Sequence, residues 1–253
     1  MSGRFDGQVA VVTGSARGIG RATATRLAAE GATVVINDID DGAIAETVAA
    51  IARLGGAATP GLADVTSEVQ VGALIDEVVR THGRIDILVN NAGGAKPGTH
   101  WTSVQETTVA DWQAFLAMNL TSAFLCSRAV MPTMIRQRYG RVVCVSSISA
   151  EHGQRAGAGY AAGKAGLTGL VASLAKEAAP HGVAVNGVTI GNAPHPTRTV
   201  ERQALLDEWV HLGRVGRHEE FAAAIAFLCS ADASYLSGAF LAVDGGFSRF
   251  NQL

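Results

Sequence analysis

The stretch VAVVTGSARGIGRATATRLA, residues 9–28, decides the fold of this 253-residue chain. Its first residues are β-branched and apolar, as in a strand, and its alanine-rich end predicts a helix. Between them lies a turn with Gly14, Gly18 and Gly20. Glycines let the backbone pass close to a pyrophosphate, and a helix N-terminus supplies free amides with a partial positive charge. The turn therefore indicates a dinucleotide site, although its G-x-x-x-G-x-G spacing departs from the general fingerprint and leaves a plain strand-to-helix connection open.

The same alternation of strand and helix continues along the whole chain. Most of the β-branched runs are apolar on both alternating faces, as in a parallel sheet between helix layers. The segments between them are long enough for the crossovers that parallel strands require. We therefore expect a Rossmann-type, doubly wound α/β fold with a seven-stranded parallel sheet and helices on both faces. The predicted strands are residues 9–13, 33–38, 57–65, 84–91, 140–147, 182–190 and 238–246, and the predicted helices are 18–30, 41–54, 67–82, 111–138, 160–181 and 217–230.

No repeat, low-complexity tract or linker divides the chain, so residues 1–253 are expected to form a single dinucleotide-binding and catalytic domain. One long irregular insertion, about 191–216, follows the sixth predicted strand. Such folds bind ligands and carry lids beyond the carboxyl ends of their strands. We therefore expect this insertion to be a substrate lid.

Composition and charge exclude several classes of partner. Hydrophobic residues make up 48% of the chain, charged residues 17%, and the net charge is −2, so we expect no nucleic-acid partner. Cys126, Cys144 and Cys229 lie far apart in apolar runs, which favours buried thiols of a cytosolic protein over disulfides or a metal site. The N-terminus lacks the apolar region of a secretory signal, and we find no apolar segment of the ~18 residues that a membrane span needs. We expect a soluble, cytoplasmic protein without metal or membrane.

Asp38 ends the second predicted strand, 18 residues after Gly20. A carboxylate at this place can accept hydrogen bonds from an adenosine ribose. It would repel the 2′-phosphate of NADP by roughly 1–4 kcal/mol per charge pair, which favours NAD. A helix cap or a solvated turn residue is the alternative interpretation of Asp38.

These features resemble the short-chain dehydrogenase/reductase family. The glycine turn matches its T-G-x-x-x-G-x-G motif from Thr13 to Gly20, NNAGG at 90–94 matches its N-N-A-G, and VDGG at 243–246 matches the end of its last strand. Each motif is weak alone, but their joint order and spacing are specific. The resemblance implies that Asn90 braces the sheet and that a nicotinamide cofactor is held by Gly14, Ser15, Arg17, Gly18, Ile19, Gly20, Asp38, Asp64, Val65, Asn91, Ala92, Gly93, Tyr160, Lys164, Gly191 and Ala193.

Four further residues suggest the chemistry. Tyr160 and Lys164, in GYAAGKAG, share one helix face, where a packing tyrosine and a solvated lysine are the plainer interpretation. Ser147 ends the fifth predicted strand, and Asn119 lies in mid-helix, where asparagine is unfavourable. The family's catalytic Asn, Ser, Tyr and Lys occur here in the family's order.

An ordinary tyrosine has a pKa near ~10, so its phenolate is scarce at neutral pH. The Lys164 ammonium and a positive nicotinamide ring would both favour the phenolate. Tyr160 could then remove the hydroxyl proton of an alcohol, or donate it when a carbonyl is reduced, while Ser147 holds the substrate oxygen. The resemblance further implies that Lys164 binds the nicotinamide ribose and that Asn119 holds a water linking Lys164 to solvent.

The resemblance is weaker at two places. Some NADP-dependent relatives use an arginine such as Arg17 to attract the 2′-phosphate, although it could equally be a solvated turn residue; NAD is expected because Asp38 would sit on the 2′-hydroxyl. After the sixth strand, Ile190 replaces the family's proline and His195 stands where a threonine is expected. Backbone contacts from Ala193 could survive these changes, and His195 is either a substrate or proton-handling group or a lid residue without a catalytic role.

The expected function is hydride transfer between the nicotinamide cofactor and a secondary alcohol or ketone. Polar residues near the site favour a hydroxylated or carboxylated substrate, although rim residues are commonly polar. An NADPH-dependent 3-oxoacyl thioester reductase is the alternative, with basic docking residues Arg128, Arg136, Arg138 and Lys176, although Pro132 interrupts their face. A non-catalytic dinucleotide-sensing protein is a further alternative, and the resemblance implies a homotetramer. The substrate candidates are Ser149, His152, Gln154, Asn192 and His195.

Overall fold

The computed structural model describes residues 3–194 and 199–250. The described residues form a seven-stranded sheet in the order β3-β2-β1-β4-β5-β6-β7, and all strand pairs are parallel. This confirms the predicted doubly wound fold, whose strand order reverses at β1 and opens a crevice at the carboxyl ends. The strands are β1 Val9–Val12, β2 Thr33–Asp38, β3 Ala57–Leu62, β4 Ile87–Asn90, β5 Gly140–Ser147, β6 Val183–Ile190 and β7 Phe240–Val243.

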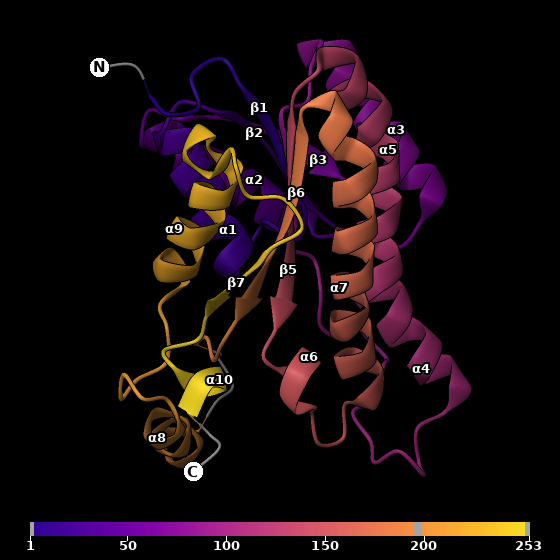
Figure 1. Ribbon diagram of the computed structural model, residues 1–253, viewed down its shortest axis with the longest axis vertical. Helices are drawn as coiled ribbons and strands as arrows, with labels where there is room; N and C mark the ends of the chain where they lie inside the picture. Colours follow the sequence, from indigo (N-terminus) through magenta and orange to yellow (C-terminus); the bar gives the residue numbers. More distant parts are fainter. Residues whose placement is uncertain (1–2, 195–198, 251–253) are drawn as a thin grey trace.

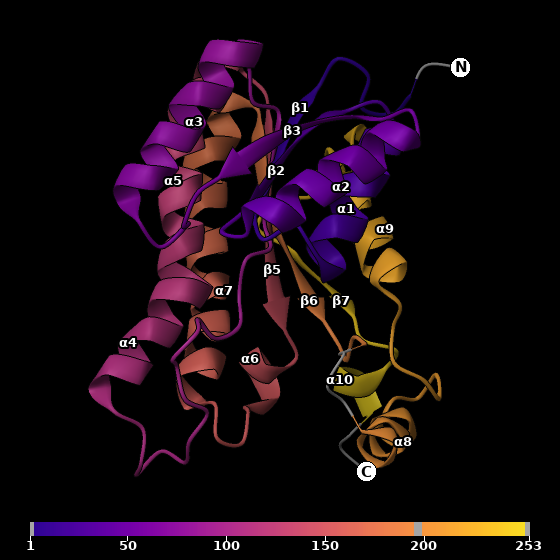
Figure 2. The same cartoon turned by 180° about the vertical axis from the view of Figure 1, so that it is seen from behind.

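Helices cover both faces of the sheet, as the two opposite views show (Figures 1 and 2). One layer holds α1 (Gly18–Ala29), α2 (Asp41–Arg53) and α9 (His218–Cys229). The other holds α3 (Glu68–His82), α5 (Ser122–Gln137) and α7 (Ala158–Ala178). The helices of both layers belong to the crossover connections that join the parallel strands.

The pattern of the central strands explains the two layers. Alternate residues of β1 bury on opposite sides, Val9 and Val11 in one apolar cluster, Ala10 and Val12 in the other. All residues of β1, β4 and β5 are buried. A strand that is apolar on both faces needs helices on both faces, and this chain supplies them.

The segment from Val109 to Gln137 is continuously helical and corrects one expectation. Among the described residues it is the single helix that is long and apolar enough, at 29 residues, to cross a membrane by length and composition. The statement that no segment reaches this length was therefore wrong. A helix that packs into a protein core passes the same test, and Cys126, Val130 and Met134 of this segment lie in the core. Pro132 lies inside α5 without ending it.

The region after β6 also differs from the expected irregular insertion. Val200–Trp209 form helix α8, whose Leu206 is buried. The sequence VERQALLDEW has few regularly spaced apolar residues, so periodicity did not indicate a helix there. Helices α8, α6 (Ser149–His152) and α10 (Phe247–Phe250) lie at one end of the molecule, beyond the strand ends of β5 to β7 (Figure 1).

Candidate active site

The turn after β1 requires glycine at its key positions. Gly14 and Gly18 have φ angles of +59° and +57°, in the left-handed region. At Gly20, a Cβ atom would lie 2.2 Å from the Gly14 carbonyl oxygen and 2.6 Å from Asn91 Nδ2. The turn is therefore packed too closely to accept a side chain at Gly20.

The same turn ends in an open helix N-terminus. Among the described residues, no side chain caps α1 and no acidic residue stands in its first turn. The first amides of the helix are thus available to an anion, and its dipole favours one. Ser15 has a different part: its hydroxyl donates to Val12 O at 2.7 Å and its N–H donates to Asn37 O at 2.9 Å, so it braces the turn. This cradle fits the pyrophosphate of a dinucleotide.

A pocket opens beside this turn at the carboxyl ends of β1 to β4. It is lined by the predicted cofactor residues Gly14, Asp38, Asp64, Val65, Asn91, Ala92 and Gly93, and by Asn37, Ile39, Ala63 and Met118, which we did not predict. Asn37 donates to Gly61 O at 2.8 Å and to Ala63 O at 3.0 Å, which joins the ends of β2 and β3. Asn37 is a polar residue next to Asp38 in a mainly apolar strand, and this pattern could have identified it from the sequence.

Thr13 and Asn91 connect the glycine turn to the end of β4. The Thr13 hydroxyl accepts from the N–H groups of Asn91 and Ala92, each at 3.0 Å. Asn91 Nδ2 in turn donates to Thr13 O and Gly14 O, each at 2.9 Å. Two motifs 77 or 78 residues apart in sequence are thereby fixed in one frame.

Asp38 and Arg17 are held differently at the mouth of the pocket. The Asp38 carboxylate accepts from Ile39 N at 2.8 Å and from Ala16 N at 3.3 Å, and it lines the pocket. Arg17 pairs with Asp40, with Nη2 2.6 Å from Oδ2. Asp40 is also the N-cap of α2, since its side chain accepts from Ala43 N. Asp38 is therefore not the helix cap that one interpretation of the sequence allowed.

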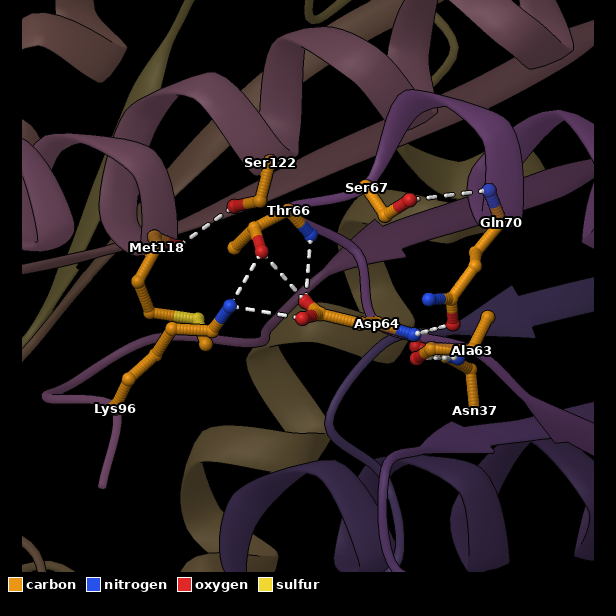
Figure 3. Close-up of polar contacts among 9 residues, drawn as sticks. All are labelled: Asn37, Ala63, Asp64, Thr66, Ser67, Gln70, Lys96, Met118 and Ser122. Carbon is orange, nitrogen blue, oxygen red and sulfur yellow. Dashed lines mark hydrogen bonds and ion pairs between the residues drawn. The ribbon is translucent and has the colours of Figure 1, made fainter. Parts of the chain in front are cut away.

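Asp64 faces Lys96 across the pocket wall (Figure 3). Lys96 Nζ lies 2.8 Å from Asp64 Oδ2 and 2.5 Å from Thr66 Oγ1. Burial by itself would raise the pKa of Asp64, but hydrogen bonds from Lys96 and Thr66 outweigh burial and hold the pKa below its usual value. Lys96 was not among the predicted site residues, because nothing in its loop sequence marks it.

Asn119 has an unusual backbone setting. It lies in a π-helical turn, Ala117–Thr121, between α4 (Val109–Leu116) and α5. Its Nδ2 donates to Phe115 O at 2.9 Å and Gly94 O at 2.8 Å, and its Oδ1 accepts from Gly94 N at 2.8 Å. Single π turns inside helices are frequent at functional sites. The mid-helix asparagine that the sequence flagged therefore binds the loop after β4.

Lys164 is buried behind the pocket. Its Nζ donates to Val145 O at 2.7 Å. Burial lowers the pKa of Lys164 to about 8. A Cβ on Gly93 would lie 2.8 Å from Lys164 Nζ and 3.0 Å from Asn119 Oδ1, so Gly93 leaves the room that both side chains occupy.

Tyr160 lies one turn before Lys164 on α7, and Lys164 Nζ is 6.0 Å from the centroid of its ring. Burial raises the pKa of Tyr160, and a hydrogen bond with Ser147 lowers it only in part. The phenolate-favouring effect expected from Lys164 therefore does not outweigh burial in this structure. Tyr160 is accordingly a protonated group, suited to donate its proton.

The serines at the end of β5 have separate parts. Ser146 donates to Lys164 O at 3.0 Å, on the helix side of the strand. Ser147 Oγ accepts from Ser149 N at 3.2 Å, and Ser147 lies close enough to Tyr160 to lower the pKa of its phenol. Its role as the catalytic serine stays a prediction. Ser149 is buried and donates to Gln154 Oε1 at 3.2 Å.

Trp101 packs against the ring of Tyr160 and was not singled out from the sequence. The centroids of the two rings are 5.4 Å apart, and Trp101 also contacts Phe115 at 4.9 Å. The signal that could have identified it is its place in the loop GGAKPGTHW, which follows the N-N-A-G motif. His152, on α6, is exposed and contacts Phe247 of α10 with 5.4 Å between ring centroids.

The residues after β6 pack against the end of β7 and line a second pocket. A Cβ on Gly191 would lie 2.6 Å from Asp244 Cα, so this glycine is required by packing against the end of β7. Asn192 lines a second pocket with Val210 and Phe221, and its Nδ2 is buried without a partner among the described residues. Ala193 is half-buried. His195 lies outside the described residues.

The chain is similar to known proteins over most of its length. The family model described as "Enoyl-(Acyl carrier protein) reductase" matches residues 14–248, which is most of the chain. The 3-oxoacyl-(acyl-carrier-protein) reductase FabG of Thermotoga maritima is 38% identical over 247 residues, covering 96% of this chain and 98% of the relative.

Two further relatives are named for other activities. The cis-4-hydroxycyclohexanecarboxylate dehydrogenase of Sinomonas cyclohexanicum is 40% identical over 251 residues, covering 98% of this chain and 99% of the relative. A solved structure of 7α-hydroxysteroid dehydrogenase with NADH and 7-oxo glycochenodeoxycholic acid superposes with a TM-score of 0.90 at 34% identity, covering 96% and 95% of the two chains. The chain therefore belongs to the short-chain dehydrogenase/reductase family of nicotinamide-dependent oxidoreductases.

Proposed function

We propose that this protein is an NAD-dependent dehydrogenase that interconverts a secondary alcohol and a ketone, with Tyr160 as its acid and base. The observation that carries the proposal is the convergence of four groups. Ser147 lies close enough to Tyr160 to lower the pKa of its phenol, Lys164 follows one turn later on α7, and Asn119 lies beside Lys164 across Gly93. This group stands next to a pocket whose glycine turn fits a dinucleotide.

The cofactor would be held along that pocket. Its pyrophosphate would meet the turn Gly14–Gly20, its adenosine the side of Asp38, Asp64 and Val65, and its nicotinamide half the side of Gly93 and Lys164. The set also includes Ser15, Arg17, Ile19, Asn91, Ala92, Tyr160, Gly191 and Ala193. When bound, the nicotinamide accepts or gives a hydride.

The side chains divide the remaining work. Ser147 binds and orients the substrate oxygen and stabilises the charge that develops on it. When the ketone is reduced, Tyr160, whose neutral form is favoured by burial, donates its proton to that oxygen; when the alcohol is oxidised, the tyrosinate form of Tyr160 accepts the hydroxyl proton. Lys164 is positively charged below its pKa of about 8, which favours the tyrosinate left after donation. Trp101 covers the Tyr160 ring and limits its contact with water.

NAD is proposed over NADP because of the groups at the end of β2. The Asp38 carboxylate lines the pocket, where it would accept from the 2′-hydroxyl and repel a 2′-phosphate. Arg17, the group that could attract that phosphate, is paired with Asp40. Release of Arg17 would have to break this ion pair.

The proposed substrate is a hydroxylated or carboxylated small molecule. The dehydrogenase of Sinomonas cyclohexanicum at 40% identity acts, by its name, on a hydroxy acid. Polar side chains in the segments after β5 and β6 suit such a substrate: Ser149, His152, Gln154 and Asn192, with His195 as a further candidate. We propose the region 191–216 as the lid over it, within one domain formed by residues 1–253.

A 3-oxoacyl thioester reductase is the second candidate function. The Thermotoga maritima relative at 38% identity carries that name, and its activity would call for basic residues that dock the acyl carrier. In this chain Arg128 pairs with Glu68, and Arg138 donates to Pro180 O at 3.2 Å, so both are partly engaged. We therefore rank it below the alcohol dehydrogenase.

We further propose a cytoplasmic homotetramer, built through α5, α7 and β7. Phe124 on α5 is 41% exposed and Leu241 on β7 is 38% exposed. These large apolar side chains are far more exposed than those of the protein core, as expected if a partner subunit covers them. Light scattering tests this assembly: a clean monomer would refute it.

The experiment for the function is a spectrophotometric screen at 340 nm. NAD and NADP are each offered with cyclic hydroxy acids, diverse secondary alcohols and, in the reverse direction, acetoacetyl thioesters. Turnover of a hydroxy acid or secondary alcohol with NAD is the expected result. Preferred reduction of the thioester by NADPH would instead establish the second candidate, and tight nucleotide binding without any turnover would favour a dinucleotide-sensing protein.

A further inference from the structure

A single lysine links the two walls of the cofactor pocket. Lys96 lies in the loop between β4 and α4, and Asp64 and Thr66 lie in the turn between β3 and α3. We call the contact of the Lys96 ammonium with the Asp64 carboxylate and the Thr66 hydroxyl the Lys96 bridge. Figure 3 shows the lysine reaching across from its own loop, beside Met118, to both acceptors.

The two ends of the bridge belong to the proposed cofactor site. Asp64 lines the pocket on one side, and Gly93 and Met118 line it on the other. Lys96 follows Gly93 by three residues, and Gly94 between them is held at both backbone groups by Asn119. The bridge therefore holds the loop between β4 and α4 at Lys96, whereas Asn119 holds the same loop at Gly94.

The Asp64 carboxylate has one oxygen that is still able to accept. Its Oδ1 accepts from Thr66 N at 2.9 Å and from Thr66 Oγ1 at 2.7 Å. Its Oδ2 accepts from Lys96 alone among the described residues, at 2.8 Å. Because a carboxylate oxygen can accept two hydrogen bonds, Oδ2 retains capacity for a donor that enters the pocket. The lysine fixes the orientation of that oxygen and keeps the carboxylate ionised.

The bridge differs from an ordinary surface ion pair. The side chains of Lys96 and Asp64 are 29% and 28% exposed, whereas those of the Arg80–Glu77 pair on α3 are 73% and 57% exposed. Exposed pairs contribute little because solvent screens them and long side chains lose freedom. A partly buried, charge-assisted contact is stronger and more directional.

We propose that Lys96 is a positioning residue that sets the affinity for the adenosine half of the cofactor by holding the Asp64 carboxylate in place. This inference rests on the proposed nicotinamide function. It predicts an effect on the adenosine half alone, because the bridge does not touch the groups around Tyr160.

The test measures binding of ADP-ribose and of nicotinamide mononucleotide separately, by calorimetry on the full chain. Lys96→Met is expected to raise the Kd for ADP-ribose about tenfold, the scale of one lost charge-assisted contact, and to leave the Kd for nicotinamide mononucleotide unchanged. Lys96→Arg, which keeps charge and donors, is expected to restore most of the affinity. Arg80→Met breaks an exposed ion pair outside the pocket and serves as the matched control, with no expected change.

A double-mutant cycle tests whether Lys96 acts through Asp64. In an Asp64→Asn background, Lys96→Met is expected to have little further effect on ADP-ribose binding. Unchanged or tighter ADP-ribose binding by Lys96→Met would overturn the inference while the proposed function stands, since wild-type binding establishes the cofactor site independently. Failure of the wild-type protein to bind either nucleotide would overturn both. Equally weakened binding of ADP-ribose and of nicotinamide mononucleotide would also overturn the inference, because it would indicate a general loss of structure.

Discussion

The side chain of Asn119 holds Gly94 by both of its backbone polar groups. Its Oδ1 accepts from Gly94 N and its Nδ2 donates to Gly94 O, each at 2.8 Å. The contact connects the π turn before α5 to the loop after β4, and both lie beside the buried amine of Lys164. One asparagine thereby positions the loop that separates the cofactor pocket from the proposed catalytic groups.

Replacing this side chain should therefore destabilise the fold. Asn119→Ala leaves both Gly94 groups and Phe115 O without their present partner, and we expect a loss of about 1–3 kcal/mol in the free energy of unfolding. Urea denaturation measures it. Ser122→Ala, which removes a single hydroxyl bond to Met118 O, is the matched control and should cost about 1 kcal/mol or less. Equal effects of the two variants would contradict the role given to Asn119.

The buried amine of Lys164 should give stability a specific pH dependence. Its pKa in the folded protein, about 8, is below the ordinary value of 10.5, so the unfolded chain binds this proton more tightly. The folded state carries the full cost of charging Lys164 below pH 8, and this cost disappears as the pH rises to 10.5. It amounts to about 3 kcal/mol for a shift of this size.

Lys164→Met isolates this effect from other groups that titrate in alkali. The stability of the variant relative to wild type should be greatest at pH 7 and should fall by up to about 3 kcal/mol as the pH approaches 10.5. Urea denaturation at pH 7, 8.5 and 10 measures the difference. A difference that does not change with pH would mean that Lys164 keeps an ordinary pKa in the folded protein.

The close contact at Gly20 predicts a steric effect. Gly20→Ala places a Cβ 2.2 Å from Gly14 O, so the turn must shift, and we expect destabilisation of about 1–3 kcal/mol with weaker NADH binding. Gly72→Ala, on α3, meets nothing within 4 Å among the described residues and should stabilise by about 0.5–1 kcal/mol as a helix substitution. Thermal denaturation and NADH fluorescence check both. Tolerance of alanine at Gly20 would show that the turn is not closely packed.

The carboxylate of Asp38 should set the cofactor preference. Asp38→Ala removes a repulsion of roughly 1–4 kcal/mol toward a 2′-phosphate, so the ratio of NADPH to NADH affinity should rise about tenfold or more. Fluorescence titration with each nucleotide measures the ratio. Arg17→Ala is the companion variant: it should change the wild-type ratio little, because Arg17 is paired with Asp40. Tighter binding of NADPH than NADH by the wild-type protein would reverse the proposed preference.

The sequence predicted the fold correctly where the local pattern and the tertiary packing favour the same secondary-structure element. β2 and β5 have the predicted bounds, because their apolar runs are limited by turn residues and both faces are buried. α8 was missed because its residues have no regular apolar spacing, and tertiary contacts such as that of Leu206 stabilise it. The single predicted helix 111–138 contains a π turn at Asn119, whose side chain accepts from Gly94 N in a distant loop, a contact that the local sequence pattern does not show.

The candidate site was predictable to the extent that it depends on motif order. The residues of the glycine turn and of NNAG are adjacent to strand ends, and parallel strand ends meet at one edge of the sheet. The environment of Tyr160 was not predictable, because its burial depends on Trp101 and the packed helices around it. Lys96 was missed for a related reason: only the folded loop brings its amine to Asp64.

The most direct test of the account is turnover and NADH binding by Tyr160→Phe, measured with a substrate found in the 340 nm screen. The variant keeps the ring that packs on Trp101 and loses the hydroxyl group that carries the proton. We predict that turnover falls by about 10²–10⁴-fold, the usual contribution of a positioned acid or base, while the Kd for NADH stays close to that of wild type. Turnover within a few-fold of wild type would contradict the assignment of Tyr160 as the acid and base.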